Sequence, residues 1–149
     1  MMTIVLATGL LFGACSRQKT YSRFQHVSET GWEKVDTIDF YIPPMKESGT
    51  YLEELELRID NTFPFQSLTM EVIQTIFPEG KTTSLNRTCP LIDEDGNIKG
   101  GGVSLFLYPF PLNDVSLNQG DSLHISVVHC MKREIMPGVI DVGISLTKQ

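Results

Sequence analysis

Three oxygen-bearing side chains stand at alternate positions in the segment Asp93-Glu94-Asp95-Gly96-Asn97, where they could coordinate a metal ion. Calcium-binding loops begin with this spacing, but they also need a bidentate glutamate that completes the coordination sphere. No glutamate stands at the required distance in this chain. Because Asp-Gly is also the usual pair of a tight hairpin turn, we expect a polar turn here and no metal.

The histidines His26, His124 and His129 are the next candidates for acid–base or metal chemistry. His124 and His129 are five residues apart on one expected strand, so their rings should point to opposite faces. Glu53 and Glu54 alternate in the same way, whereas glycosidases need two carboxyl groups that face each other across the sugar. The sequence contains no GxSxG, HExxH or P-loop motif. We therefore expect a protein that is not an enzyme and that needs no cofactor.

Cys15 is the residue with the most specific chemical role. It follows an uncharged, apolar run over residues 3–14 that is too short to span a bilayer and suits the core of a signal peptide. Gly13 and Ala14 supply the small side chains that a signal peptidase needs, and the chain turns polar and basic after Cys15. This order resembles a lipobox, in which the cysteine thiol is alkylated with diacylglycerol and becomes the first residue of the mature protein. Cys15 is therefore the predicted lipidation site, and lipid is expected to anchor the chain to a membrane.

Two further cysteines, Cys89 and Cys130, could pair in an oxidising compartment. The alternative is two free, buried thiols that behave as small hydrophobic side chains. No CxxC motif or metal knuckle surrounds either residue, and their spacing leaves both interpretations open.

The segments that position these residues have the alternation typical of strands. Over residues 51–60, for example, Leu55, Leu57 and Ile59 share one face, and polar side chains take the other. Further strands are expected over residues 35–42, 67–77, 81–92, 103–110, 122–131 and 139–147, with a short helical or irregular link over residues 131–138. Short strands separated by turn signals predict an all-β fold, an antiparallel β-sandwich of the immunoglobulin-like or jelly-roll-like kind.

The expected organisation is a single domain behind a signal peptide. Residues 1–14 are the predicted lipoprotein signal peptide, residues 15–31 the lipidated N-terminus and tether, and residues 32–149 the β-sandwich domain. The tether prediction rests on Arg17, Lys19 and Arg23, which have no acidic neighbour and suit an anionic membrane surface. The formal net charge of −6 argues against a nucleic-acid partner, which would need a basic face.

Tyr108 and Phe110 are the candidate residues for contact with a partner protein. They alternate with Pro109 and Pro111, which remove hydrogen-bond donors and should close a strand near a sheet edge. The two rings either pack inward, as aromatic side chains often do, or form a rigid aromatic surface for a partner.

Taken in order, these segments resemble the gliding motility lipoprotein GldH family of the Bacteroidetes. The resemblance covers nearly the whole chain from Cys15 onward, and it rests on Trp32, on Asp39-Phe40, on Tyr51 ahead of LELRIDN, and on PFQSLTMEV. Its most specific part is the C-terminal run HISVVHCMKREIMPGVIDVGISL, which contains Met131, Arg133, Met136, Gly138, Val139, Asp141, Val142 and Gly143.

The resemblance implies an outer-membrane lipoprotein that assists motility or secretion machinery through contacts with envelope proteins, and it does not imply an enzyme. Surface-exported lipoproteins of that phylum tend to have acidic residues directly after the cysteine. The segment Ser16-Arg17-Gln18-Lys19 has none, which favours the periplasmic side. The competing interpretation is a lipid-anchored β-sandwich module that binds carbohydrate or another small ligand.

Overall fold

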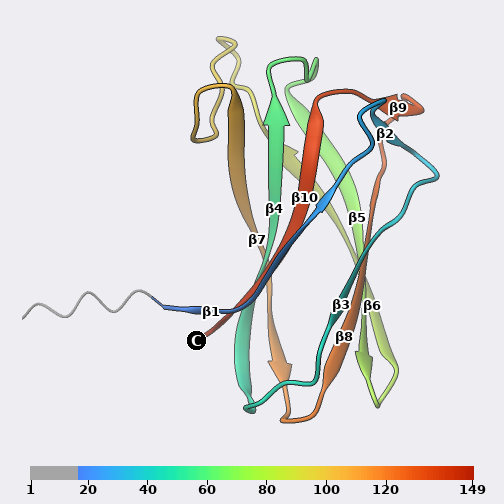
Figure 1. Ribbon diagram of the computed structural model, residues 1–149, viewed down its shortest axis with the longest axis vertical. Coiled ribbons are helices and arrows are strands. Elements are labelled where there is room, and N and C mark those ends of the chain that lie inside the picture. The colour runs from blue at the N-terminus through green and yellow to red at the C-terminus, as the bar shows by residue number, and fades with distance from the viewer. Residues whose placement is uncertain (1–16) are drawn as a thin grey trace, which may run out of the picture.

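The computed structural model describes residues 17–149, which form ten strands and no helix (Figure 1). The predicted signal peptide and Cys15 lie outside the described residues. In chain order the strands are β1 (Lys19–His26), β2 (Trp32–Glu33), β3 (Ile38–Ile42), β4 (Gly49–Asp60), β5 (Ser67–Phe77), β6 (Lys81–Pro90), β7 (Leu105–Leu117), β8 (Ser122–His129), β9 (Ile135–Met136) and β10 (Val139–Lys148). Because no helix occurs in the described range, no helix there could cross a membrane.

Two four-stranded antiparallel sheets make a sandwich, as the sequence predicts. One sheet has the order β1-β10-β4-β7, the other has the order β3-β8-β5-β6, and β2 pairs with β9 in a short ribbon. The sheets lie face to face in Figure 1. Strands β6 and β7 are both edge strands, because each has a hydrogen-bonded neighbour on one side only.

The hydrophobic alternation of the sequence explains the core between the sheets. Leu55, Leu57 and Ile59 of β4 are buried, and they face Leu68, Met70 and other apolar side chains of the second sheet in one contiguous cluster. Burial of apolar surface contributes roughly 25 cal/mol per Å², so this face supplies most of the favourable free energy of the fold. The confirmed alternation also places Glu53 on the inner face, between Tyr51 and Leu55.

The structure corrects the N-terminal boundary of the domain. Residues 19–26, which the basic composition assigned to a tether, form β1 and pair with β10 from Lys19↔Thr147 to His26↔Asp141. The strand is held because the Phe24 ring covers Gly143, where an added Cβ would come within 2.7 Å of that ring. The guanidinium of Arg58 lies 3.7 Å from the centroid of the same ring. The sandwich therefore begins at Lys19 and not at Trp32, which is buried in the core.

The expected link over residues 131–138 is not helical, because β9 lies within it. The acidic segment at residues 93–97 is the predicted hairpin turn: the Asp93 N–H donates to the Asn97 carbonyl oxygen over 2.9 Å. The Asp93 carboxylate accepts the backbone N–H groups of Asp95 and Asn97, so the turn itself uses its oxygens. Among residues 17–149, no group of three His, Cys, Asp or Glu side chains could hold a metal ion.

The two cysteines of the domain are not bonded to each other and differ in environment. Cys89 is buried, and that burial raises the pKa of its thiol to about 12. Cys130 is exposed and follows the last residue of β8, so the expectation of a buried thiol inside a strand is wrong for this residue.

Candidate functional site

The structure decides between the two alternatives for Tyr108 and Phe110 in favour of inward packing. Tyr108 is only 3% exposed, and its hydroxyl donates a hydrogen bond of 2.7 Å to the Leu91 carbonyl oxygen. The Phe110 ring is half-buried and stacks beside it, with ring centroids 6.1 Å apart. Both rings point inward because they occupy alternate positions of β7, while Pro109 and Pro111 take the exposed positions. The prolines do not end the strand, because β7 is an edge strand and tolerates missing donors.

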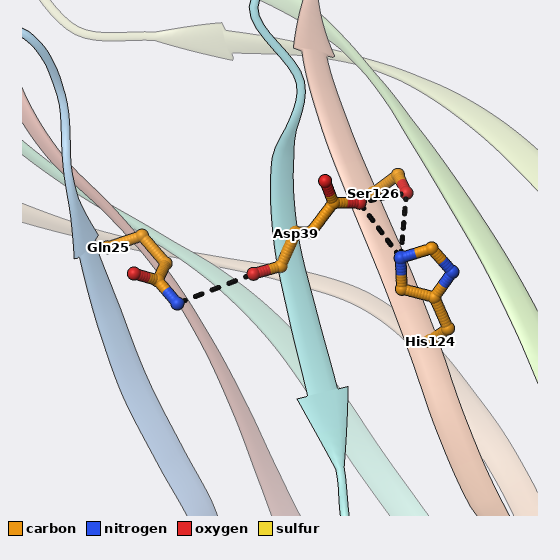
Figure 2. Close-up of polar contacts among 4 residues, drawn as sticks. All are labelled: Gln25, Asp39, His124 and Ser126. Atoms are coloured by element: carbon orange, nitrogen blue, oxygen red, sulfur yellow. Dashed lines mark hydrogen bonds and ion pairs between the residues drawn. The ribbon is translucent and has the colours of Figure 1, made fainter.

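A polar cluster on the outer face of the second sheet is a better candidate for a functional surface. Asp39 of β3 lies opposite Ser126 of β8, and Tyr41 lies opposite His124 in the same register. We call these four residues the β3–β8 patch. Figure 2 shows how the side chains of Asp39, His124 and Ser126 converge.

The Asp39 carboxylate is the centre of this cluster. Its Oδ1 accepts the Ser126 hydroxyl over 2.6 Å and lies 2.8 Å from His124 Nε2. The Ser126 hydroxyl, and less strongly the His124 ring, hold the pKa of the Asp39 carboxyl below its usual range, although partial burial acts in the opposite direction. From the other sheet, the Gln25 side-chain amide donates to the Asp39 backbone carbonyl oxygen over 3.4 Å, which links β1 to β3 (Figure 2). The carboxylate is thus ionised and fixed in position at neutral pH.

The cluster contains the residue types of a serine hydrolase but not their arrangement. In such a relay the histidine stands between the other two residues and uses one ring nitrogen for each. Here the Ser126 hydroxyl and His124 Nε2 both meet the same carboxylate oxygen, and Ser126 Oγ lies 3.3 Å from that same Nε2. The hydroxyl proton goes to Asp39, so His124 is not placed to activate Ser126 as a nucleophile. The geometry fits a rigid binding surface better than a catalytic centre.

Tyr41 gives the patch an exposed aromatic surface. Its side chain is 72% exposed and stacks on the His124 ring, with centroids 4.5 Å apart and ring planes 2° from parallel. A groove of about 490 Å³ adjoins the pair and is also lined by Pro43, Pro44 and the partly exposed Phe77. Stacking restrains both rings, so little side-chain entropy remains to be lost when a partner binds.

Several hydroxyl groups lie on the rest of this sheet face. Thr75 of β5 lies beside His124 in the register, and its hydroxyl is 2.9 Å from that of Thr82 on β6. In the next row Ser84 of β6 donates to the Glu71 carboxylate over 2.6 Å. Polar side chains therefore extend from the patch onto β5 and β6, with Ile73 between Ser126 and Ser84.

The sequence analysis singled out His124 but missed Asp39, Tyr41 and Ser126 as its neighbours. It did predict that His124 and His129 face opposite sides, and this is confirmed: His129 is buried, 3.1 Å from the Trp32 carbonyl oxygen. Asp39 and Tyr41 occupy outward positions of one predicted strand, and His124 and Ser126 occupy outward positions of another. Only the pairing register of β3 with β8, across about 85 residues of chain, brings them together.

Comparison with known proteins identifies the relatives of this chain. The model of the family described as GldH lipoprotein matches residues 19–146. A protein of Flavobacterium johnsoniae named gliding motility lipoprotein GldH is 26% identical over 100 residues, which are 66% of this chain and 61% of that protein. The match thus spans less than two thirds of the length of that relative.

Solved structures resemble the sandwich only distantly. A family GH115 4-O-methyl-α-glucuronidase superposes with a TM-score of 0.46 and 12% identity, over 89% of this chain and 18% of the enzyme. A family 35 carbohydrate-binding module from Clostridium thermocellum superposes with a TM-score of 0.38 and 13% identity, over 83% of this chain and 90% of the module. Both TM-scores are below 0.5.

Proposed function

The chain belongs to the GldH lipoprotein family, and from this premise we propose that it is an envelope-anchored accessory protein of gliding motility or of the related secretion machinery. In this proposal, lipid on Cys15 holds the protein in the outer membrane of a member of the Bacteroidetes, with the domain facing the periplasm. The protein acts by binding envelope proteins and has no enzymatic activity of its own. The observation that supports this best is the family match, which extends over nearly all of the folded domain.

We place the contact with the partner on the β3–β8 patch. Exposed aromatic side chains are enriched in the centres of protein interfaces, and an ionised carboxylate with fixed geometry adds specificity. The exposed ring of Tyr41, beside its groove, supplies the first feature. The Asp39 carboxylate supplies the second on the same face. This surface replaces Tyr108 and Phe110 as the candidate contact.

The position of the groove favours a partner at the membrane. Only three residues separate Cys15 from β1, and the four residue steps from Cys15 to Lys19 span at most about 14 Å. The start of β1 and the segment that includes Pro43 and Pro44 line a common depression, so the groove lies near the anchored end of the domain. We therefore expect the partner to be a membrane protein or a protein bound to the same membrane.

Replacing Tyr41 by alanine should reduce recovery of the partner without unfolding the domain. The side chain is largely exposed, so the free energy of unfolding should change by less than about 1 kcal/mol, whereas loss of an aromatic anchor from an interface costs about 2 kcal/mol or more. The measurement is affinity purification from cross-linked, detergent-solubilised membranes. Val103→Ala is the matched control, because that side chain is 95% exposed and lies outside the patch. Equal recovery with both variants would remove the patch from the proposal.

Carbohydrate binding is the second candidate function, and one observation favours it. The exposed tyrosine ring could stack on a sugar ring, and the carboxylate beside it could accept hydrogen bonds from the sugar hydroxyl groups. Titration with cell-surface polysaccharides separates the two candidates. Binding that is lost in Tyr41→Ala would favour the sugar, and recovery of a discrete protein favours the accessory role.

A further inference from the structure

A second hollow lies between the two sheets, beside the edge strands β6 and β7. It has a volume of about 460 Å³, which is within the range of small-molecule sites. The buried side chains that line it come from β4 and β5, and the exposed ones come from β6 and β7. The cavity therefore opens to solvent between the two edge strands and ends in the core.

Glu53 places a carboxyl group at the inner end of this cavity. The residue is only 4% exposed, because the alternation of β4 directs its side chain between the sheets. It lies opposite the bulge in β7, where the register with β4 shifts between Leu52 and Glu54. Among residues 17–149, no hydrogen bond or ion pair joins the Glu53 carboxyl to another group. Burial of a carboxylate without a partner is costly, and it raises the pKa of Glu53 to about 7.

Gln74 of β5 adds a second unsatisfied acceptor to the same cavity. Its side-chain carbonyl oxygen is buried and has no hydrogen-bond partner in the described part of the chain. Apolar side chains, including Val72, Leu85 and Leu112, complete the walls. Two buried acceptors behind apolar walls suit a ligand with several hydrogen-bond donors at the end of an aliphatic stem.

The charged groups around the cavity leave the Glu53 carboxylate without a partner. Lys81 of β6 and Asp114 of β7 line the exposed rim, and no titratable side chain of β5 or β10 lines the cavity. Burial is the only cause of the raised pKa of Glu53, so the Lys81 ammonium exerts no comparable effect on it. Lys148 of β10 is engaged elsewhere, because it pairs with Glu47 over 2.6 Å.

We propose that this cavity binds a cationic head group, an ammonium or a guanidinium, carried on an aliphatic stem, with the Glu53 carboxylate and the Gln74 carbonyl oxygen as its acceptors. The head group satisfies both buried acceptors, and the stem lies against the apolar walls. The ligand is either a free alkylamine or the lysine or arginine side chain of another protein. This site is separate from the β3–β8 patch and does not depend on the function proposed for it.

The test is a calorimetric and NMR titration of the full chain in detergent micelles with n-butylammonium. We expect binding at about pH 8.5, where Glu53 is ionised, and an affinity at least about tenfold lower at about pH 5.5, where it is protonated. Neutral n-butanol should bind no more than weakly at either pH. A lysine-containing tripeptide with blocked ends is titrated in parallel: tighter binding of the peptide identifies a protein side chain as the ligand, and tighter binding of n-butylammonium identifies a free amine.

Variants with matched controls make the test decisive. Glu53→Gln keeps the shape of the side chain and should weaken n-butylammonium binding at least about tenfold, whereas Glu54→Gln, on the opposite face of β4, should leave it unchanged. Glu53→Gln should also melt no lower than the unaltered protein at about pH 8.5. In the unaltered protein the folded-state pKa of Glu53 is raised above its unfolded value. The stability that Glu53 contributes is therefore complete below the unfolded pKa and is lost as the pH rises through about 7, so glutamine at this position costs nothing at about pH 8.5.

Lys81→Met removes the cation from the rim of the cavity and should not weaken n-butylammonium binding, because Lys81 does not pair with Glu53. The proposal is overturned if n-butylammonium binds neither the unaltered protein nor Lys81→Met. It is also overturned if Glu53→Gln and Glu54→Gln bind n-butylammonium equally well.

Discussion

A Cys15→Ala variant should remain an uncleaved precursor and should pass from the detergent phase to the aqueous phase in a phase-partition experiment. Without the thiol no diacylglycerol is attached, and the peptidase that recognises the lipidated cysteine has no substrate. Each buried methylene contributes about 0.8 kcal/mol, so the loss of two or three acyl chains removes the membrane affinity that the lipid supplies. Intact mass and phase partition measure both effects.

Cys130→Ala is the matched control for that experiment. Cys130 is exposed and lies at the end of β8, so its replacement should change neither processing nor partition. A Cys15→Ala protein that is still cleaved and still enters the detergent phase would show that the anchor lies elsewhere.

Tyr108→Ser should destabilise the domain by about 4 kcal/mol. The change removes a buried aromatic ring, and such truncations cost 3–5 kcal/mol in well-packed cores. The ring also supports the loop before β7, because Gly100 packs against it so closely that an added Cβ would lie 2.5 Å from the ring. Denaturant unfolding of the two proteins measures the difference.

Tyr108→Phe separates the ring from its hydroxyl group. It removes only the hydrogen bond to the Leu91 carbonyl oxygen, which still accepts the Lys99 backbone N–H over 3.0 Å, so the change should cost about 1 kcal/mol. An unchanged melting temperature in Tyr108→Ser would mean that the ring is a surface group, and Tyr108 and Phe110 would again be candidates for contact with a partner.

The long inner strands of the sandwich could be predicted because they depend on local alternation. The predicted segment 67–77 coincides with β5, and the alternation of Leu55, Leu57 and Ile59 identifies the inner face of β4. Inward packing of Tyr108 and Phe110 was one of the two alternatives, and the same alternation favours it. The expectation that Pro109 and Pro111 close the strand was wrong, because an edge strand accommodates proline without ending.

The parts that could not be predicted depend on contacts between distant segments. Strand β1 has a polar, basic sequence, and it is a strand because β10 pairs with it and Gly143 makes room for Phe24. The β3–β8 patch similarly depends on a register that no local pattern contains. Glu53 could be predicted only in part. Its inward position follows from the alternation, but the cavity it faces depends on how β6 and β7 approach each other.

The most direct test of the central claim, an anchored protein that works by contact through the β3–β8 patch, is photo-cross-linking in living cells. A photoreactive amino acid is placed at position 41 or, as the control, at the even more accessible position 103. We expect a discrete protein adduct from position 41, none from position 103, and loss of the position 41 adduct when Cys15 is replaced by alanine. Adducts of equal yield from both positions, or an adduct at position 41 that persists without Cys15, would contradict the account.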